Sequence, residues 1–242
     1  PVSCANRAML SISSLLKHLK PLLAQDCLLC VARADAQPIC VGCADALPYH
    51  DAPACPQCAL LTPDAKLCGE CLSHPPVFDT TIAAFDYSFP VDTLVHQIKY
   101  QHNLALIDFV ADALWRKLGK AEKPDVLFAM PLHSARLGQR GFNQSVEIAR
   151  QLSRRSAVPL QVAGYQRTRD TKEQATLKWK QRHANVRGAF ACELDLRGKH
   201  VAVVDDVMTT GATLNEFANT LKQSGAEKIS VYVVARTLKR EK

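Results

Sequence analysis

The chain has 242 residues, enough for one large domain together with a small one. Its net charge is +7 and 48% of its residues are hydrophobic, an ordinary share for a folded protein. No apolar run reaches the roughly 18 residues of a transmembrane helix, so the composition excludes a membrane-spanning protein.

Residues 1–24 predict an amphipathic helix. Its apolar side chains, between Leu10 and Leu19, are interrupted by Lys17 and followed by Lys20. The segment lacks the apolar core and the small-residue cleavage site of a secretory signal peptide, so we expect a cytoplasmic protein. Because residue 1 is Pro and not Met, we expect the natural start to lie upstream.

Residues 25–76 are rich in cysteine and predict a double zinc ribbon. Eight of the ten cysteines form four Cys-x-x-Cys pairs, with nine residues between the first two pairs and nine between the last two. Each pair offers two thiolates to one metal ion, and two pairs complete a tetrahedral site. A segment this small needs such a staple because its apolar core is too small. The predicted ligands are Cys27, Cys30, Cys40, Cys43, Cys55, Cys58, Cys68 and Cys71.

Disulfides, a redox motif and an iron–sulfur cluster are the alternatives to zinc for these cysteines. Disulfides disagree with a cytoplasmic location, and a redox Cys-x-x-Cys motif explains one pair but not four. An iron–sulfur cluster stays open. We favour Zn²⁺ at two structural sites, since a closed Cys4 site has no open coordination position. Pairing the first motif with the second and the third with the fourth is simplest, and an interleaved cross-brace is the alternative. Cys4 and Cys192 are left over.

After Pro75-Pro76, strands alternate with helices, which predicts a parallel α/β sheet over residues 77–242. Residues 168–187 are polar and basic without a clear period, and so long a loop in a compact domain is usually functional or mobile. The expected strands are 80–87, 125–130, 160–167, 199–204 and 229–235, and the expected helices are 91–100, 104–118, 144–155 and 213–224.

The positive charge is concentrated in one region. Residues 131–190 hold twelve Lys and Arg residues against three acidic ones, whereas the remainder of the chain holds 18 against 20. Such a concentration predicts an anionic partner: pyrophosphate, a nucleotide or nucleic acid. A solvated basic surface is the alternative.

The stretch VAVVDDVMTTGAT, residues 201–213, carries the strongest chemical signal. Its four apolar residues predict a central parallel strand, and Asp205 and Asp206 follow at the carboxyl end, where ligands of open α/β sheets bind. Residues 209–213 then open a helix and leave backbone N–H groups for a phosphate. Acceptors for sugar hydroxyls beside a phosphate cradle predict a ribose-phosphate site. The pattern is neither a Walker loop nor a dinucleotide fingerprint.

These thirteen residues resemble the phosphoribosyl-pyrophosphate (PRPP) signature of type I phosphoribosyltransferases. The entire chain resembles the ComF/GntX family of competence-associated proteins. That match rests on the PRPP loop, the paired Cys-x-x-Cys ribbons, His96-Gln-Ile-Lys-Tyr100, Arg140-Gly-Phe-Asn-Gln144 and Arg182-x-x-Asn185. The resemblance implies an α/β fold: a type I phosphoribosyltransferase-like parallel sheet flanked by helices, with a small N-terminal Cys4 zinc-ribbon module.

The resemblance also implies roles for single residues. The two loop acids hold the ribose hydroxyls, Mg²⁺ bridges pyrophosphate and ribose oxygens, and a basic loop within 167–187 closes over the site. Catalysis is expected from Asp205, Asp206, Lys172 and Arg140, with Arg182 a further candidate. The PRPP-binding residues expected are Asp205, Asp206, Thr209, Thr210, Gly211, Ala212, Thr213, Pro131, Leu132, Arg136 and Lys99. For Lys99 an exposed helix position is the alternative, and Asn143 and Gln144 either contact substrate or cap a helix.

The leading functional hypothesis is a ComF-like protein of natural competence, DNA uptake and DNA utilisation that transfers phosphoribosyl from PRPP to an unknown acceptor. One alternative handles single-stranded DNA, with Tyr165, Trp179 and Phe190 stacking on bases among the basic residues. Another senses PRPP without catalysis. Competence or recombination proteins are further candidate partners.

Overall fold

The computed structural model describes residues 25–35, 37–101, 103–119, 121–170 and 186–238. The chain divides into two compact units, residues 1–47 and 48–242, which we treat separately. Several predictions lie outside the described residues: the helix over 1–24, the roles of Lys172 and Trp179, the motif Arg182-x-x-Asn185, and positions 171–185 of the basic loop expected to close over the site.

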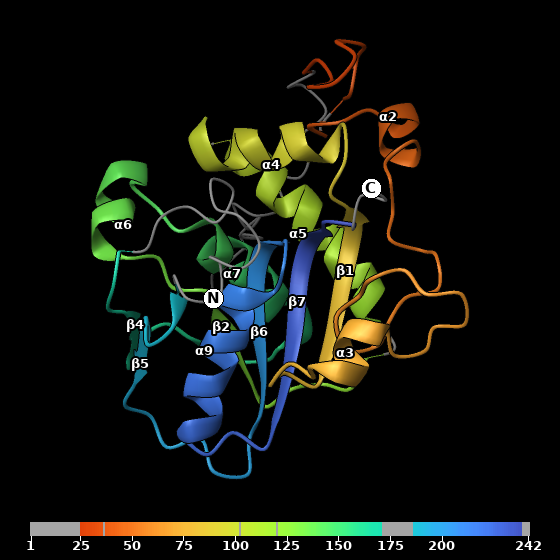
Figure 1. The fold of residues 1–242 in the computed structure, drawn as a ribbon. Coiled ribbons are helices and arrows are strands. Elements are labelled where there is room, and N and C mark those ends of the chain that lie inside the picture. The colour runs from red at the N-terminus through yellow and green to blue at the C-terminus, as the bar shows by residue number, and fades with distance from the viewer. Residues whose placement is uncertain (1–24, 36, 102, 120, 171–185, 239–242) are drawn as a thin grey trace, which may run out of the picture. The chain divides into compact units, whose positions relative to one another are not determined.

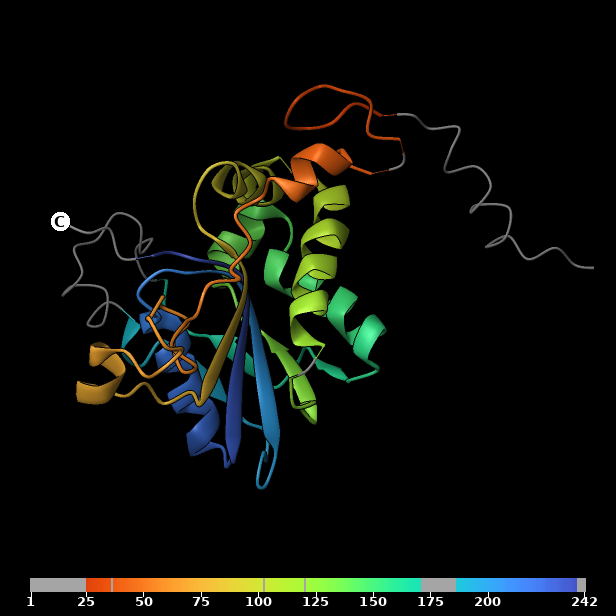
Figure 2. The same cartoon turned by 90° about the vertical axis from the view of Figure 1, so that its right-hand side faces the viewer.

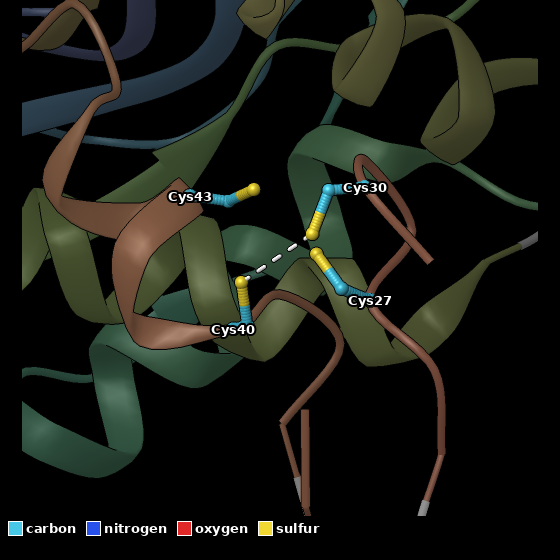
Figure 3. A group of neighbouring side chains, drawn as sticks. All are labelled: Cys27, Cys30, Cys40 and Cys43. Carbon is cyan, nitrogen blue, oxygen red and sulfur yellow. Dashed lines mark hydrogen bonds between the residues drawn. The ribbon is translucent and has the colours of Figure 1, made fainter. Parts of the chain in front are cut away.

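The smaller unit presents its four cysteines from a turn and from a helix. Within the turn, the N–H of Cys27 donates to Ala32 O at 2.7 Å and the N–H of Val31 donates to Cys27 O at 2.9 Å. Cys40 then caps the short helix α2 (Val41–Asp45), which carries Cys43. Figure 3 shows the four side chains converging from these two segments.

The larger unit opens with a second cysteine ribbon, which repeats these contacts 28 residues later in the chain. The N–H of Cys55 donates to Leu60 O at 2.7 Å, and the N–H of Ala59 donates to Cys55 O at 2.8 Å. Cys68 caps helix α3 (Gly69–Ser73), which carries Cys71. The repeated hydrogen bonds show that the two ribbons are copies of one structural unit.

A five-stranded sheet forms the centre of the larger unit, and all its pairings are parallel, in the order β1-β7-β6-β2-β3. Residues 201–204 of β6 are completely buried, as apolar strands covered on both faces must be. The strands are β1 (Thr80–Asp86), β2 (Val126–Ala129), β3 (Leu160–Gln161), β6 (His200–Met208) and β7 (Lys228–Arg236).

Helices cover both faces of this sheet (Figures 1 and 2). Helices α5 (Leu104–Leu118) and α7 (Gln144–Ser156) pack together on one face, and α9 (Ala212–Gln223) packs on the other. Two further helices, α4 (Val91–Tyr100) and α6 (Ser134–Arg140), lie near the carboxyl ends of the strands.

The second ribbon shares its hydrophobic core with the α9 face of the sheet. Cys55, Cys58 and Cys71 belong to the same buried cluster as Phe78 and Phe217. In Figure 2 the ribbon with α3 lies on the same side of the sheet as α9. The second metal-ligand group is therefore part of the packing of the larger unit.

The structure corrects one expected strand in this region and adds two elements that were not expected. The strand predicted over 160–167 is wrong as a single element: it divides into β3 and β4 (Tyr165–Arg167), and β4 pairs antiparallel with β5 (Phe190–Cys192), which the sequence did not indicate. Gly164 makes the break with φ +81°, and a Cβ there would lie 2.6 Å from Leu194 Cδ2. Helix α6 was also not predicted.

Strand β6 is longer than predicted and continues to Met208, because its pairing with β7 extends to the Met208–Arg236 register. The acidic pair, expected after the strand, therefore lies within its final residues. Among the described residues, no helix is long and apolar enough to cross a membrane.

Candidate functional site

A cavity of about 380 Å³ opens at the carboxyl ends of β2 and β6. It brings together most of the residues predicted to bind PRPP. Pro131 is buried beside it, Thr210 lines a different cavity, and Lys172 lies outside the described residues. The predicted residues that line it are Lys99, Leu132, Arg136, Arg140, Asp205, Asp206, Thr209, Gly211, Ala212 and Thr213.

The two acids on β6 are held by separate partners. Asp205 Oδ1 accepts hydrogen bonds from Ser145 Oγ at 3.0 Å and from the N–H of Asp206 at 2.9 Å. Asp206 Oδ2 accepts a hydrogen bond from Gln144 Nε2 at 2.7 Å and lies 2.9 Å from Lys99 Nζ. These contacts fix the two carboxylates side by side, and Lys99 of α4 supplies the cation that faces Asp206.

Burial and charge repulsion shift the ionisation of this pair. Burial, and next the charge of Asp206, raise the pKa of Asp205 to about 7. Burial alone lowers the pKa of Lys99, but its ion pair with Asp206 outweighs burial and leaves the pKa above its usual value. Lys99 is thus a partly buried cation committed to the acidic pair, and the exposed helix position considered for it is wrong.

The loop after β6 offers unused backbone donors. Gly211 adopts φ +80° as the N-cap of the twelve-residue helix α9, and a Cβ there would lie 2.7 Å from Met208 Cε. Within the described part of the chain, no protein acceptor is found for the backbone N–H groups of Thr209, Thr210 and Gly211. Three open N–H groups at a helix N-terminus form an anion-binding cradle.

Three arginines form another wall of the cavity. Arg136 Nε donates to Asp170 Oδ1 at 3.2 Å, and Arg140 Nη2 donates to Tyr100 Oη at 3.2 Å with its guanidinium 5.0 Å from that ring's centre. Arg167 is 9% exposed, and burial together with the charge of Arg136 lowers its pKa. Part of the basic concentration in residues 131–190 therefore faces this cavity.

Several cavity residues escaped prediction. Arg167, which lines the cavity, and Ser145, which holds Asp205 from outside that lining, carry no motif signal of their own. Tyr87, His96 and Tyr100 line the cavity as well, and the spacing of the last two on α4 was a usable signal because residues four apart share a helix face. Of the two alternatives for Asn143 and Gln144, Asn143 is a helix cap, since its Oδ1 accepts from the N–H of Ser145 at 2.9 Å. Gln144 lines the cavity and donates to Asp206.

Two aromatic rings considered for stacking on single-stranded DNA are packed in the protein. The Tyr165 ring lies 4.9 Å from that of Phe128 and 5.6 Å from that of Phe217, measured between ring centres. The Phe190 ring lies 5.1 Å from that of Phe217. These contacts make Tyr165 and Phe190 parts of the core under α9, so they do not form a base-stacking surface.

The eight predicted ligands form two Cys4 groups, each with sulfur atoms within 4.8 Å of one another. The first two Cys-x-x-Cys motifs form one group and the last two form the other. The interleaved cross-brace is therefore wrong. The Cys30–Cys40 and Cys58–Cys68 sulfur pairs lie 3.7 and 3.5 Å apart, near the about 3.8 Å of a zinc tetrahedron with 2.3 Å bonds. No disulfide joins the cysteines that the structure describes.

Backbone donors lower the pKa of one cysteine in each group, whereas the pKa values of Cys43, Cys58 and Cys71 are raised by hydrogen bonds from neighbouring thiols and by burial. Burial opposes ionisation of Cys55, but backbone N–H groups, first that of Cys68, outweigh it and lower the pKa to about 7. The same balance, with the N–H of Cys40 first, lowers the pKa of Cys27 to about 6. Thiolates in a closed tetrahedral set fit structural Zn²⁺.

The raised pKa of Asp205 predicts a pH-dependent affinity for magnesium PRPP. The pKa of an aspartate in the unfolded chain is about 4. Between about pH 4 and about pH 7, Asp205 is therefore protonated in the folded protein and ionised in the unfolded chain. Folding stability contributed by Asp205 is therefore lost as pH rises through that window, while the ionised form, the stronger acceptor for a hydroxyl group or a metal ion, is gained.

We expect affinity to rise from about pH 6 to about pH 8, and the Asp205→Asn variant to lose this dependence. Calorimetric titration of both proteins across that range checks it. PRPP's own ionisation affects both proteins alike, so parallel pH curves would contradict the assignment to Asp205.

Comparison with known proteins gives two family matches. Residues 96–242 match the phosphoribosyl transferase domain, and residues 18–72 match the double zinc ribbon domain. The chain is 34% identical to DNA utilization protein YhgH of Escherichia coli O157:H7 over 207 residues, which cover 83% of this chain and 91% of the relative.

The chain is also 29% identical to competence protein F of Haemophilus influenzae over 216 residues, covering 86% and 88% of the two chains. Among solved structures, purine phosphoribosyltransferase from Pyrococcus horikoshii Ot3 is 25% identical, with a TM-score of 0.34 over 54% of this chain and 82% of that one.

Proposed function

The chain belongs to the phosphoribosyltransferase family that includes DNA utilization protein YhgH, and from this premise we propose that it binds PRPP with Mg²⁺ and transfers the phosphoribosyl group to an acceptor. One observation carries the proposal. A single cavity combines two fixed carboxylates, a helix N-terminus with open N–H groups, and a wall of arginines. These are the recognition elements for hydroxyls, a monophosphate and a pyrophosphate.

Each part of PRPP has a matching partner. The 5′-phosphate binds the N–H groups of residues 209–211 at the start of α9, where the helix dipole favours an anion. The ribose hydroxyls donate to Asp205 and Asp206. The pyrophosphate lies toward Arg136 and Arg140, because bidentate guanidinium groups suit phosphate oxygens.

The acidic pair also fits Mg²⁺, which prefers oxygen ligands and is usually held by one or two carboxylates together with substrate phosphates. Asp205 and Asp206 are the residues that would hold it. When bound, the ion supplies positive charge that stabilises the departing pyrophosphate. Lys99 is the protein's own cation at this position, so it balances Asp206 before ligand binding.

The reaction that follows is a substitution at C1′ of the ribose. The bond from C1′ to the pyrophosphate oxygen breaks, the oxygen leaves with the electron pair, and the acceptor nucleophile forms the new bond and releases its proton. Arg136 and Arg140 stabilise the charge that grows on the leaving group. Catalytic roles for Asp205, Asp206, Arg140 and Lys172 are parts of this proposal.

We further propose that this chemistry serves the use of DNA, because the relatives are named for DNA utilization and competence. DNA, or a component derived from it, is then the candidate acceptor or partner. The packing of Tyr165 and Phe190 gives no support to a strand-stacking surface at those residues.

The test is a pyrophosphate-release assay with PRPP and Mg²⁺, run with a panel of nucleobases, amines and single-stranded DNA. We expect release with one class of acceptor, and none in the Asp205→Asn, Asp206→Asn variant. PRPP binding by calorimetry without release in any arm would contradict transferase activity and favour a PRPP sensor. Absence of PRPP binding would contradict the site itself.

A further inference from the structure

Arg236, the last residue of β7, is a buried cation in an unusual setting. It is 3% exposed, and within the described residues its guanidinium donates to backbone carbonyls alone. Nε donates to Cys58 O at 2.7 Å, while Nη1 donates to Met208 O at 3.0 Å, to Thr237 O at 2.8 Å and to Thr209 O. Among the described residues, no carboxylate lies within ion-pair distance of it. A buried charge without a counter-charge is strongly unfavourable, so its compensation needs a source.

The second Cys4 group lies directly beside this cation. Cys58, whose carbonyl oxygen accepts the hydrogen bond from Arg236 Nε, is also one of the four sulfur ligands of that group. Four thiolates around one Zn²⁺ carry a net charge of about −2. A buried zinc–thiolate centre and a buried arginine therefore neutralise part of each other's charge.

The other contacts of Arg236 lead to the phosphate cradle. Met208 and Thr209 begin the loop whose open N–H groups form the proposed phosphate site. In a trans peptide the C=O and the next N–H point in opposite directions. With the carbonyls of Met208 and Thr209 turned toward Arg236, the N–H groups of Thr209 and Thr210 point away from it and stay available for an anion.

Hydrogen bonds supplement the packing between ribbon and loop. Met208 packs in the same buried cluster as Cys58, but a cavity of about 570 Å³, lined by residues that include Cys71, Thr210 and Arg236, lies beside this contact. Next to that cavity, the hydrogen bonds of Arg236 connect the ribbon to the loop. Apart from Arg236, Met208 O accepts one further hydrogen bond, from the N–H of Thr237 at 3.0 Å.

We propose that Arg236 is a positioning residue that couples the second zinc–thiolate site to the phosphate-binding loop, so that this zinc supports binding of the 5′-phosphate in addition to the fold. The proposal rests on the proposed function, because it concerns the same loop. It assigns the two metal sites different roles: only the second is linked to ligand affinity.

The primary test compares Arg236→Gln with the wild-type chain by calorimetry, using three probes: PRPP, ribose 5-phosphate and pyrophosphate, each with Mg²⁺. Losing one charge-assisted hydrogen-bonding group weakens binding by about tenfold. We expect that loss for PRPP and ribose 5-phosphate, which engage the loop, and an unchanged affinity for pyrophosphate. The matched control is Arg197→Gln, at an exposed arginine paired with Asp195.

A purely structural role would weaken all three probes together, and that pattern, or unchanged affinity for every probe, would overturn the proposal. If circular dichroism shows that Arg236→Gln does not fold, Arg236→Lys is used in its place. It keeps the charge but loses the forked geometry, and it should show the same selective loss at smaller size.

The zinc link is tested separately with Cys71→Ser in the second group and Cys43→Ser in the first, with zinc content measured for each. We expect Cys71→Ser to lose affinity for ribose 5-phosphate and Cys43→Ser to keep it. Equal effects of the two variants would refute the coupling. If the wild-type chain binds neither PRPP nor ribose 5-phosphate, the proposed function itself fails. If the wild-type chain binds them and Arg236→Gln binds them equally well, only the coupling proposal fails.

Discussion

The double variant Asp205→Asn, Asp206→Asn is expected to lose PRPP binding while keeping its fold. Each carboxylate supplies a charged acceptor for the sugar hydroxyls or Mg²⁺, and a hydrogen bond to a charged group contributes about 1.5–3 kcal/mol. Two such losses weaken binding by at least about 100-fold. Calorimetric titration with PRPP and Mg²⁺ measures the change.

Folding should survive at some cost in stability, because asparagine preserves the hydrogen bonds at both positions but removes the ion pair between Asp206 and Lys99. Burial already raises the pKa of Asp205 to about 7, so the fold does not depend on its ionised form, and removing that charge relieves repulsion within the pair. Gln144 and Ser145 can bond to an amide as they do to a carboxylate. The exposed acid Asp195 serves as a control through Asp195→Asn, whose affinity should match the wild type. Unchanged affinity in the double variant would disprove the site assignment.

Loss of the second Cys4 site is expected to have the largest effect on stability. Structural zinc contributes apparent free energies of about 10–16 kcal/mol in isolated zinc fingers, as large as the whole stability of about 5–15 kcal/mol of a typical domain. Cys55, Cys58 and Cys71 lie in the core cluster shared with Phe78 and Phe217. Without metal, the buried thiol groups no longer have an ion to coordinate. The ribbon then loses the bonds that hold it over the apolar residues of the core.

Cys55→Ser with Cys58→Ser should therefore lower the melting temperature of the larger unit and leave one zinc ion per chain. The matching variant Cys27→Ser with Cys30→Ser removes the first site, which lies in the smaller unit, and should leave the melting of the larger unit near that of the wild type. Metal analysis of the unmodified chain should give two zinc ions. Fewer than one per chain, or equal melting curves for both variants, would contradict the account.

Local patterns were sufficient for the features that depend on neighbours along the chain. The spacing of Cys-x-x-Cys pairs identified both metal groups because each ribbon closes over nine intervening residues. The run of apolar residues before Asp205 and Asp206 identified a buried parallel strand, since only a strand covered on both faces is apolar throughout. The small residues after it predicted a helix from residue 213, and the helix begins one residue earlier, at Ala212, with Gly211 as its N-cap.

Long-range contacts escaped the sequence for a physical reason. Ser145 and Gln144 were joined to the acids only by packing of α7 on β6, across some 60 positions of chain. The strand predicted over 160–167 failed because Gly164 turns the chain into a second sheet, whose partner β5 lies more than 20 residues later. Tyr165 and Phe190 resembled surface rings among basic residues, yet the fold turns them inward onto Phe217.

The same division applies to function. The sequence by itself determined the two Cys4 groups and predicted a ribose-phosphate loop, because those chemistries need certain residue types at short, regular spacing. Only the tertiary structure decided how they are joined. Arg236 lies 178 residues from Cys58 and 27 from Thr209, and it links them because β7 pairs with β6 and the second ribbon packs on the same face as α9.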